Sequence, residues 1–403
     1  MTVHYELPTT ADFTALAGPH HPAITIYAST SPVVSERERA EVAVKSAFDD
    51  AIEQVKSAGA ASAPEVDALR RSRHEILGAQ RLWAGLARSL AIFVAPGFSE
   101  VFVLPNRLDD AVHVGSHFTL GQLLRAPSQD QEAYALTLSA HEWCLWHATP
   151  TDRATKLDVD PSGAANLDEA TNREPGEDKP RGSNRGMGGI ASQGGASRLM
   201  GDEGRKTLLD LYAKRVADVV RRELQQRDAE ERVPIFVFAA EPLLSLFIDR
   251  SRNGRRMVAA PGAPDRLGAA EIDDAVRHQL ATLNIDEAKS ALRQLTEGTA
   301  GRVERDLAAI GREAADGAVE TFWFDFTTSV NGTLDRESGA IQFATGNGVG
   351  ENLHDGTHAG DLLPQIALLV ISKGGKVVTV RSEDLDGEVW SGPAMAELRF
   401  ALA

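Results

Sequence analysis

The stretch from Lys179 to Leu224 decides how the chain is organised. It begins KPRGSNRGMGGIASQGGASR at residues 179–198, a run that is dense in glycine and serine and carries four bases and no acid. It ends LLDLYAKRVADVVRREL at residues 208–224, where apolar residues recur at helical spacing. The pattern predicts a basic glycine-rich loop that leads into a long amphipathic helix. Such a loop is suited to contact an anionic partner.

Two interpretations of this loop are open from the residues alone. The whole segment 162–205 has no hydrophobic period, and loops of this length are usually either functional or disordered. In the first interpretation, its glycines let backbone N–H groups approach an anion or a reacting carbonyl. In the second, it is a disordered surface insertion. The run matches neither the P-loop pattern nor the dinucleotide-binding glycine fingerprint, so a nucleotide site is not expected.

Length and composition fit a globular protein of several domains. The chain has 403 residues, of which 42% are hydrophobic and 25% charged. Its formal net charge of -16 argues against broad coating of nucleic acid, but not against a binder that places bases only where it makes contact. No window resembles a membrane span and no signal peptide is recognised, so we expect a cytoplasmic protein without membrane contact. A single cysteine, Cys144, excludes an intrachain disulfide.

The order of apolar runs predicts an α/β protein of three mixed α/β domains. An N-terminal α/β domain is expected over residues 1–127, with a strand at 22–29, a helix that starts at Ser35 and ends at Gly59, a second helix over 64–88 and a hairpin at Pro96-Gly97. The run at 112–114 suggests a further strand and 119–125 a short helix.

The middle domain is expected over residues 128–262. Two strands around a turn at 140–142 are followed by a third strand at 157–160, the Gly-rich loop at 162–205, the long helix and a fully buried strand at 234–240. The C-terminal α/β domain is expected over 263–403. It has predicted helices over 270–298 and 303–317, a strand with Phe322, Phe324 and Phe326 on one face, and a helix capped by Asp361.

The evidence for other metal-binding or catalytic residues in the sequence is weak. His141 and His147 flank one predicted strand, and His354 and His358 lie in a second polar loop, where surface histidines are the simpler interpretation. The strand at 134–139 carries no acid, which argues against a metal-dependent nuclease there. Cys144 has apolar neighbours and is expected to be buried rather than nucleophilic. No metal and no cofactor is predicted.

Several motifs, in this order and at this spacing, give the chain a family resemblance. They are APGFSEVFVLP at 95–105, DDAVHVGSHFTLGQLL at 109–124, AYALTLSAHEWCLWHAT at 133–149, GGIASQGGASRLMGDEGRKTLLDLYAKRVADVV at 188–220 and SGPAMAELRFAL at 391–402. Together they resemble the bacterial branch of the archaeo-eukaryotic peptide-chain release factor and Pelota family. The resemblance implies a ribonuclease-H-like middle domain without nuclease function and a last domain similar to the kink-turn-binding ribosomal proteins.

The resemblance also implies where the chain would act. The Gly-rich loop stands where release factors carry a Gly-Gly-Gln motif that enters the peptidyl-transferase centre. The implied partners are the ribosome, at its A site and peptidyl-transferase centre, its ribosomal RNA, and a possible translational GTPase. Gln193 is the implied catalytic residue, because it is the only Gln of the loop. The implied contacts to ribosomal RNA are Lys179, Arg181, Arg185, Gly188, Gly189, Gly194, Gly195 and Arg198.

The chain departs from the family pattern in two places. Gly188-Gly189-Ile190 precedes Ser192-Gln193-Gly194-Gly195, so Gly-Gly-Gln is not contiguous. The link between the two N-terminal helices reads SAGAASAP, whereas release factors carry an Asn-Ile-Lys-Ser segment there to read stop codons. Stop-codon decoding is therefore not expected.

Two functions are consistent with these departures, and a third interpretation is independent of the family. The first function is ribosome rescue, with possible hydrolysis of peptidyl-tRNA. The second is a non-catalytic hibernation or protection factor that binds ribosomes. The third interpretation is an α/β protein with an unrelated small-molecule site.

Overall fold

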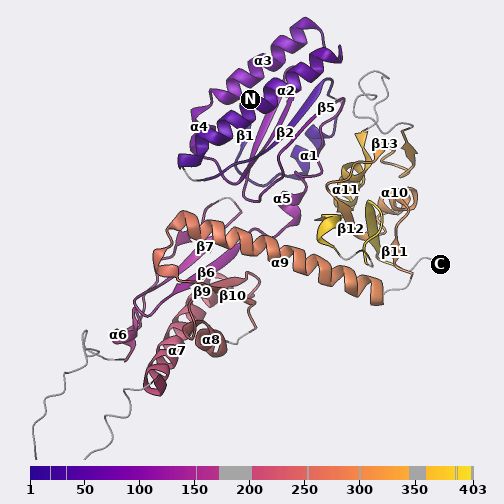
Figure 1. The fold of residues 1–403 in the computed structure, drawn as a ribbon. Helices are drawn as coiled ribbons and strands as arrows, with labels where there is room; N and C mark the ends of the chain where they lie inside the picture. The colour runs from indigo at the N-terminus through magenta and orange to yellow at the C-terminus, as the bar shows by residue number, and fades with distance from the viewer. Residues whose placement is uncertain are drawn as a thin grey trace, which may run out of the picture. The chain divides into compact units, whose positions relative to one another are not determined.

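The computed structural model describes residues 1–18, 20–32, 34–150, 152–171, 202–251, 254–298, 301–344, 360–385, 387 and 389–400. These residues form two compact units (Figure 1). Unit 1 joins both ends of the chain, residues 1–131 and 280–403, and unit 2 holds residues 132–279. The predicted α/β class is confirmed. The three-domain division at residues 127 and 262 stays a prediction.

The N-terminal part of unit 1 is a five-stranded sheet of order β1-β4-β3-β2-β5. Its elements are β1 Thr2–His4, α1 Thr10–Leu16, β2 Ala23–Ser29, α2 Arg37–Ser57, α3 Ala63–Leu77, α4 Gln80–Ala84, β3 Ser89–Ala95, β4 Phe98–Leu104, β5 Ala111–Gly115 and α5 Arg125–Ser128. The predicted hairpin turns at Gly97, whose φ of 80° suits a residue without a Cβ. One face of the sheet packs against α2 and α3 through Val44, Phe48 and Leu69.

The other face of this sheet shares its core with the C-terminal part of the chain. Phe93 and Phe102 belong to the same hydrophobic cluster as Phe322, Leu363 and Ile366. The C-terminal elements are β11 Val303–Glu304, α10 Leu307–Ala315, β12 Val319–Asp325, β13 Asn331–Leu334, β14 Ile341–Phe343, β15 Gly360–Asp361, α11 Leu362–Ser372, β16 Lys376–Val380 and β17 Ala394–Leu398. They form sheets of order β11-β17-β12-β16 and β14-β13-β15.

Strand β12 shows the predicted alternation. Phe322, Phe324 and Phe326 join the core shared with the N-terminal part. Trp323 points to the opposite face, where it packs with Leu292 and Leu295 of α9 (Ala269–Gly298). The C-terminal part therefore has the mixed α/β structure that the order of apolar runs predicted.

Unit 2 is a five-stranded sheet of order β10-β9-β6-β7-β8. Its elements are β6 Ala133–Leu138, β7 Trp143–Ala148, β8 Thr155–Lys156, α6 Leu167–Thr171, α7 Asp202–Arg227, β9 Ile235–Ala239, α8 Leu243–Arg250 and β10 Met257–Pro261. If β6 to β10 are numbered 1 to 5 along the chain, the order across the sheet from β8 to β10 is 3-2-1-4-5. Only the second of them, β7, is antiparallel to the other strands. This is the strand order of the ribonuclease-H-like fold, as predicted.

Helix α7 covers one face of this sheet together with α8 (Figure 1). Its inner face carries Leu209, Tyr212 and Val216, as the helical spacing predicts, and packs on Leu136 of β6 and Val237 of β9. None of the helices in the part of the chain that the structure describes has the length and apolar character that a membrane span requires.

Several predicted boundaries are wrong for local reasons. The helix predicted over 64–88 ends at Leu77, because Gly78 follows as the C-cap, and α4 is separate. The helix predicted at 119–125 is instead α5, at Arg125–Ser128. The third strand of unit 2 is Thr155–Lys156 rather than 157–160. The helix predicted from Val303 starts at Leu307, where the Asp306 side chain accepts hydrogen bonds from the backbone N–H groups of the first turn.

Asp361 gives the fold a pH dependence. It caps α11 and accepts hydrogen bonds from the N–H groups of Val330 and Leu363, but burial raises the pKa of its carboxyl to about 6. A folded-state pKa above the unfolded value means that protonation favours the fold, so this group stabilises unit 1 less as pH rises from about 4 to 7.

We therefore expect Asp361→Asn to raise the thermal unfolding temperature relative to the parent at neutral pH, with the difference shrinking toward about pH 4. Asn retains the capping oxygen. Thermal unfolding at a series of pH values measures this, with the exposed cap Asp306→Asn as the matched control. A difference that is independent of pH would contradict the assignment.

Candidate functional site

The residues that the sequence nominates for function lie outside the described residues. They all fall within 172–201 and comprise Lys179, Arg181, Arg185, Gly188, Gly189, Gln193, Gly194, Gly195 and Arg198. The histidine pair His354 and His358 also lies outside the described part of the chain. The structure does describe the residues on either side of 172–201, which are the stems of the Gly-rich segment.

Both stems belong to unit 2 and pack on each other. Helix α6 ends at Thr171, before the segment, and α7 begins at Asp202, after it. Ala170 of α6 is fully buried in the same core cluster as Leu209 and Tyr212 of α7. The long segment therefore leaves and re-enters the fold at two neighbouring helix ends.

The turn after β6, residues Ser139–Glu142, holds both stems. The Tyr212 hydroxyl of α7 donates to the Ser139 carbonyl at 2.9 Å. The Leu167 N–H, at the start of α6, donates to the Ala140 carbonyl, also at 2.9 Å. The Trp143 indole N–H donates to the Ala164 carbonyl at 2.7 Å, just before α6. One turn thus fixes the chain on both sides of residues 172–201.

The same turn is itself well organised. The Ser139 hydroxyl accepts hydrogen bonds from the N–H groups of His141 and Glu142, at 3.1 and 3.2 Å. Burial raises the pKa of the Tyr212 hydroxyl, with smaller contributions from Asp265 and Glu142, so the hydroxyl stays a donor at physiological pH. The stems are therefore held by neutral hydrogen bonds that do not titrate near neutrality.

A cavity of about 650 Å³ opens beside this turn. It lies at the carboxyl ends of β6 and β9, where the chain leaves the two adjacent strands in opposite directions. Ligand sites of open α/β sheets are commonly found at such a switch point. Its charged and titratable lining residues are His141, Arg205, Lys206, Glu241 and Asp265, among apolar side chains such as Leu138, Leu209 and Leu243.

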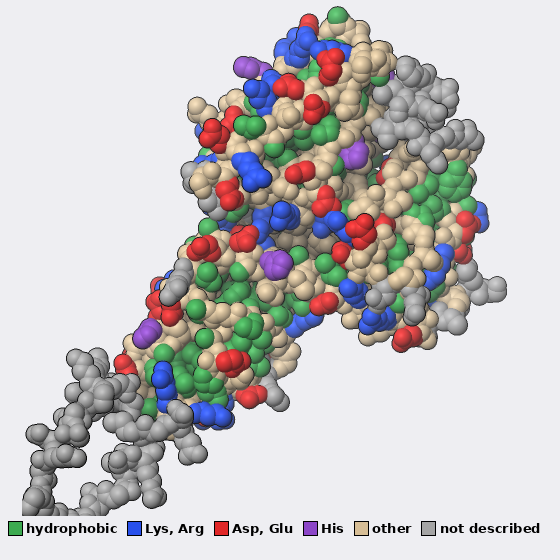
Figure 2. All heavy atoms as spheres, in the orientation of Figure 1, with side chains coloured by type: hydrophobic (Ala, Val, Ile, Leu, Met, Phe, Trp, Pro, Cys, Tyr) green, Lys and Arg blue, Asp and Glu red, His purple; other side chains and the backbone are tan. Residues whose placement is uncertain are grey.

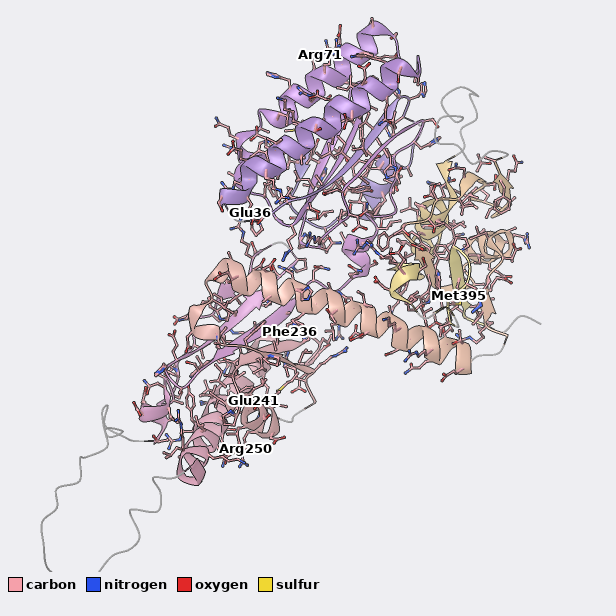
Figure 3. The ribbon with its side chains drawn as sticks, in the orientation of Figure 1. Glu36, Arg71, Phe236, Glu241, Arg250 and Met395 are labelled. Atoms are coloured by element: carbon pink, nitrogen blue, oxygen red, sulfur yellow. The ribbon has the colours of Figure 1, made fainter. Side chains whose placement is uncertain are left out.

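Sequence reasoning missed these cavity residues, apart from His141. They come from four separate segments of the chain, and none forms a motif with its neighbours in sequence. For Glu241 the available signal was its position directly after the predicted strand at 234–240, because the carboxyl ends of parallel strands share one edge of a sheet. Arg205, Lys206 and Asp265 follow no predicted strand. Glu241, labelled in Figure 3, follows β9 and accepts a hydrogen bond from the Ser245 hydroxyl at 2.8 Å.

The other titratable candidates of unit 2 have local partners. The His147 Nε2 lies 2.7 Å from Glu132 Oε1, and its ring stacks on Tyr134. Cys144 is half-buried rather than buried as predicted, and a hydrogen bond with Cys144 raises the pKa of Lys156. Within the described ranges, no three His, Cys, Asp or Glu side chains are grouped to hold a metal ion.

The link between α2 and α3 is short and capped. It spans residues 58–62, with Gly59 at a φ of 62°. The Ser62 N–H and hydroxyl both donate to Glu65 Oε2 at 2.7 Å, which closes a capping box. In the release factor pattern, this is the place of the stop-codon-reading segment.

Two Arg–Asp pairs stabilise α7, one near each end. Arg250 of α8, labelled in Figure 3, donates two hydrogen bonds to Asp210, at 2.8 and 2.6 Å. Hydrogen bonding to Arg250 is the largest cause of the lowered pKa of Asp210. Beyond the other end, Arg255 bonds the Asp228 carboxylate at 2.6 Å and the Val233 carbonyl at 2.8 Å. The Arg255 side chain is 2% exposed, whereas that of Arg250 is 47% exposed.

The surface around the site is not uniformly basic. Figure 2 shows acidic and basic side chains interspersed over the visible face of the molecule. The net charge of -16 agrees with this mixture. The acid-free run at 179–198 is a local source of positive charge in this acidic chain.

Comparison with known proteins finds a family that matches the middle of the chain. Residues 130–286 match the bacterial archaeo-eukaryotic release factor family 11. The resemblance predicted from the sequence is therefore confirmed over this range, which contains all of unit 2 and the Gly-rich segment. No curated protein matches the chain at a significant level.

Solved structures of the wider family are also similar to the chain. An archaeal translation termination factor, aRF1, is 11% identical with a TM-score of 0.24, over 98% of this chain and 99% of that one. Archaeoglobus fulgidus Pelota is 12% identical with a TM-score of 0.35, over 98% and 93%. S. cerevisiae Dom34 is 10% identical with a TM-score of 0.32, over 78% and 74%.

The two Arg–Asp pairs give a direct test of what fixes α7. Arg255→Met leaves the Asp228 carboxylate without its buried partner, which we expect to cost about 3–5 kcal/mol. Arg250→Met removes an exposed pair and is expected to change the stability of unit 2 little. Urea unfolding of both variants measures this difference. Equal destabilisation by the two substitutions would contradict the assigned role of Arg255.

Proposed function

We propose that the chain is a ribosome-associated translation factor that acts in ribosome rescue. The observation that supports this most is the family match over residues 130–286, which contains the basic Gly-rich segment on its two anchored stems. Unit 2 then serves as a rigid holder, and residues 172–201 serve as the arm that reaches the peptidyl-transferase centre from the A site.

The composition of the arm suits a tunnel lined with RNA. Lys179, Arg181, Arg185 and Arg198 would contact ribosomal RNA phosphates, in the part of the sequence that carries no acid. Gly188, Gly189, Gly194 and Gly195 lack side chains and let the backbone approach the tRNA end closely. The overall charge of -16 limits contact with RNA elsewhere on the chain.

Gln193 is the proposed catalytic residue for release. Hydrolysis of the peptidyl-tRNA ester requires a water molecule placed at the carbonyl carbon and donors for the oxyanion that develops. The Gln193 side chain would position the water, and its backbone N–H would stabilise the oxyanion. No other Gln is present in residues 172–201. A translational GTPase is a further partner in this proposal, as the delivery factor.

The non-catalytic alternative is a hibernation or protection factor that binds the same site. Two observations favour it. The interrupted order Gly188-Gly189-Ile190 departs from Gly-Gly-Gln, and the capped link at 58–62 has neither Lys nor Asn to read a codon. Both functions require the arm on the ribosome, and they differ only in whether the ester is cleaved.

Peptide release separates the two functions. With stalled ribosomes that carry labelled peptidyl-tRNA, the parent chain is expected to release peptide, and Gln193→Ala is expected to slow release about 100-fold or more because it removes a positioning and oxyanion group. Gln226→Ala, an exposed glutamine of α7, is the matched control. Release that is unchanged in Gln193→Ala would refute the catalytic role. Binding without release in the parent would favour hibernation.

Charge reversal tests the proposed RNA contacts. The variant changes four bases to Glu, namely Lys179, Arg181, Arg185 and Arg198. We expect its affinity for ribosomes in co-sedimentation to fall by about tenfold or more, and the slope of log K against log salt concentration to become shallower by ~3. The control reverses four exposed bases of unit 1, namely Arg312, Arg336, Lys373 and Lys376. Equal loss in both variants would show a general charge effect and would count against the arm.

A further inference from the structure

A second, smaller cavity lies within unit 1, where α5, α9 and β16 meet. Its volume is about 60 Å³. The side chains that carry polar groups or an aromatic face at its wall are Arg125, Gln129, Asn284, Phe326, Arg381 and Asp384. These residues come from the N-terminal part, from helix α9 and from the C-terminal part of the chain. Most of them lie outside residues 130–286, the range of the family match.

Arg125 has hydrogen-bonding capacity that the protein does not use. Its guanidinium carbon lies 4.2 Å from the centroid of the Phe326 ring. Its Nε and Nη1 atoms are buried and have no hydrogen-bond partner. Burial lowers the pKa of Arg125 to about 10, and nearby Asp109 opposes that shift, so the side chain is still cationic at neutral pH. Buried donors of a charged group that lack partners are costly, which favours an acceptor held in the cavity.

Arg381 places a second positive charge beside the first. Its guanidinium carbon lies 5.4 Å from the same Phe326 ring centroid, and it forms an ion pair with Asp109. Two like charges on one aromatic ring repel each other, and the Arg381 charge lowers the pKa of Arg125. Asp109 offsets part of this repulsion, and an anion between the two guanidinium groups would offset more of it. The Gln129 amide at the wall provides further donors. The Asn284 amide donates to the Asp130 carbonyl at 3.1 Å and has a second N–H.

The cavity also contains an acid, which restricts the kind of anion. Asp384 lines the wall and carries a negative charge that acts on Arg125. A fully deprotonated oxyanion would be repelled by this carboxylate. An oxyanion that carries an O–H can instead donate a hydrogen bond to it. By size, about 60 Å³ holds roughly four water molecules, which is room for one small tetrahedral oxyanion.

We propose that this cavity is a binding site for inorganic phosphate. Arg125 and Arg381 donate to the phosphate oxygens, and the phosphate O–H donates to the Asp384 carboxylate. Inorganic phosphate carries at least one O–H near neutral pH, whereas sulfate carries none. Phosphomonoesters are largely deprotonated at pH 7, and phosphodiesters of an RNA backbone have no O–H, so both are disfavoured. The site is independent of the arm at 172–201.

Isothermal titration calorimetry on the full chain tests the site, with phosphate, sulfate and adenosine monophosphate at matched ionic strength. We expect phosphate to bind, and sulfate and the monoester to bind about tenfold or more weakly. Asp384→Asn is expected to make the affinities for phosphate and sulfate similar. The Asn amide N–H can donate to a sulfate oxygen, whereas the Asp384 carboxylate repels the sulfate charge. Arg125→Gln is expected to weaken phosphate binding by about tenfold or more.

Arg71→Gln is the matched control, since Arg71 is an exposed arginine of α3 in the same unit (Figure 3). Circular dichroism checks that each variant is folded. If Arg125→Gln does not fold, Arg381→Gln replaces it, because the Arg381 side chain is 29% exposed. Absence of phosphate binding by the parent would overturn the proposal. Equal affinity for phosphate and sulfate would overturn it too, as would unchanged binding in the folded arginine variants.

Discussion

The hydrogen bond from the Tyr212 hydroxyl to the Ser139 carbonyl is the contact on which the proposed arm depends. Together with the Leu167 N–H bond to Ala140, it ties both stems of residues 172–201 to one turn of the sheet. Closing a long segment costs conformational entropy that grows only slowly with its length. A fold that fixes the two ends can therefore carry a long polar insertion at small extra cost to its stability.

The ribonuclease-H-like sheet explains why the stems lie where they do. The turn that holds them follows β6, which pairs in parallel with β9 at the centre of the sheet. Helix α7 then crosses the face of these two strands, with Val216 and Val220 in the core. The buried Arg255 fixes the chain just beyond the far end of this helix. The proposed arm is thus joined to elements that contribute to the buried core of unit 2, and the cavity at the switch point lies beside the start of α7.

The sequence predicts the interior of the elements better than their ends. The alternation of Phe322, Trp323 and Phe324 and the spacing of Leu209, Tyr212 and Val216 are governed by burial, which the residue types show directly. Boundaries depend on single residues, such as Gly78 and Asp306, whose competing interactions the pattern does not resolve. Strand β10 was missed because MVAAP is short and half-exposed, and it forms by pairing with β9.

The candidate functional residues also differ in how well the sequence predicts them. Composition alone identifies the basic, acid-free run around Gln193, because that signal is continuous in sequence. The residues of the switch-point cavity and of the Arg125 site come from distant segments, and only the fold brings them together. An electron cryo-microscopy structure of the chain on stalled bacterial ribosomes would test most directly whether residues 172–201 reach the peptidyl-transferase centre. We expect unit 2 in the A site with residues 172–201 in the peptidyl-transferase centre. A bound chain whose segment 172–201 lies away from that centre would contradict it.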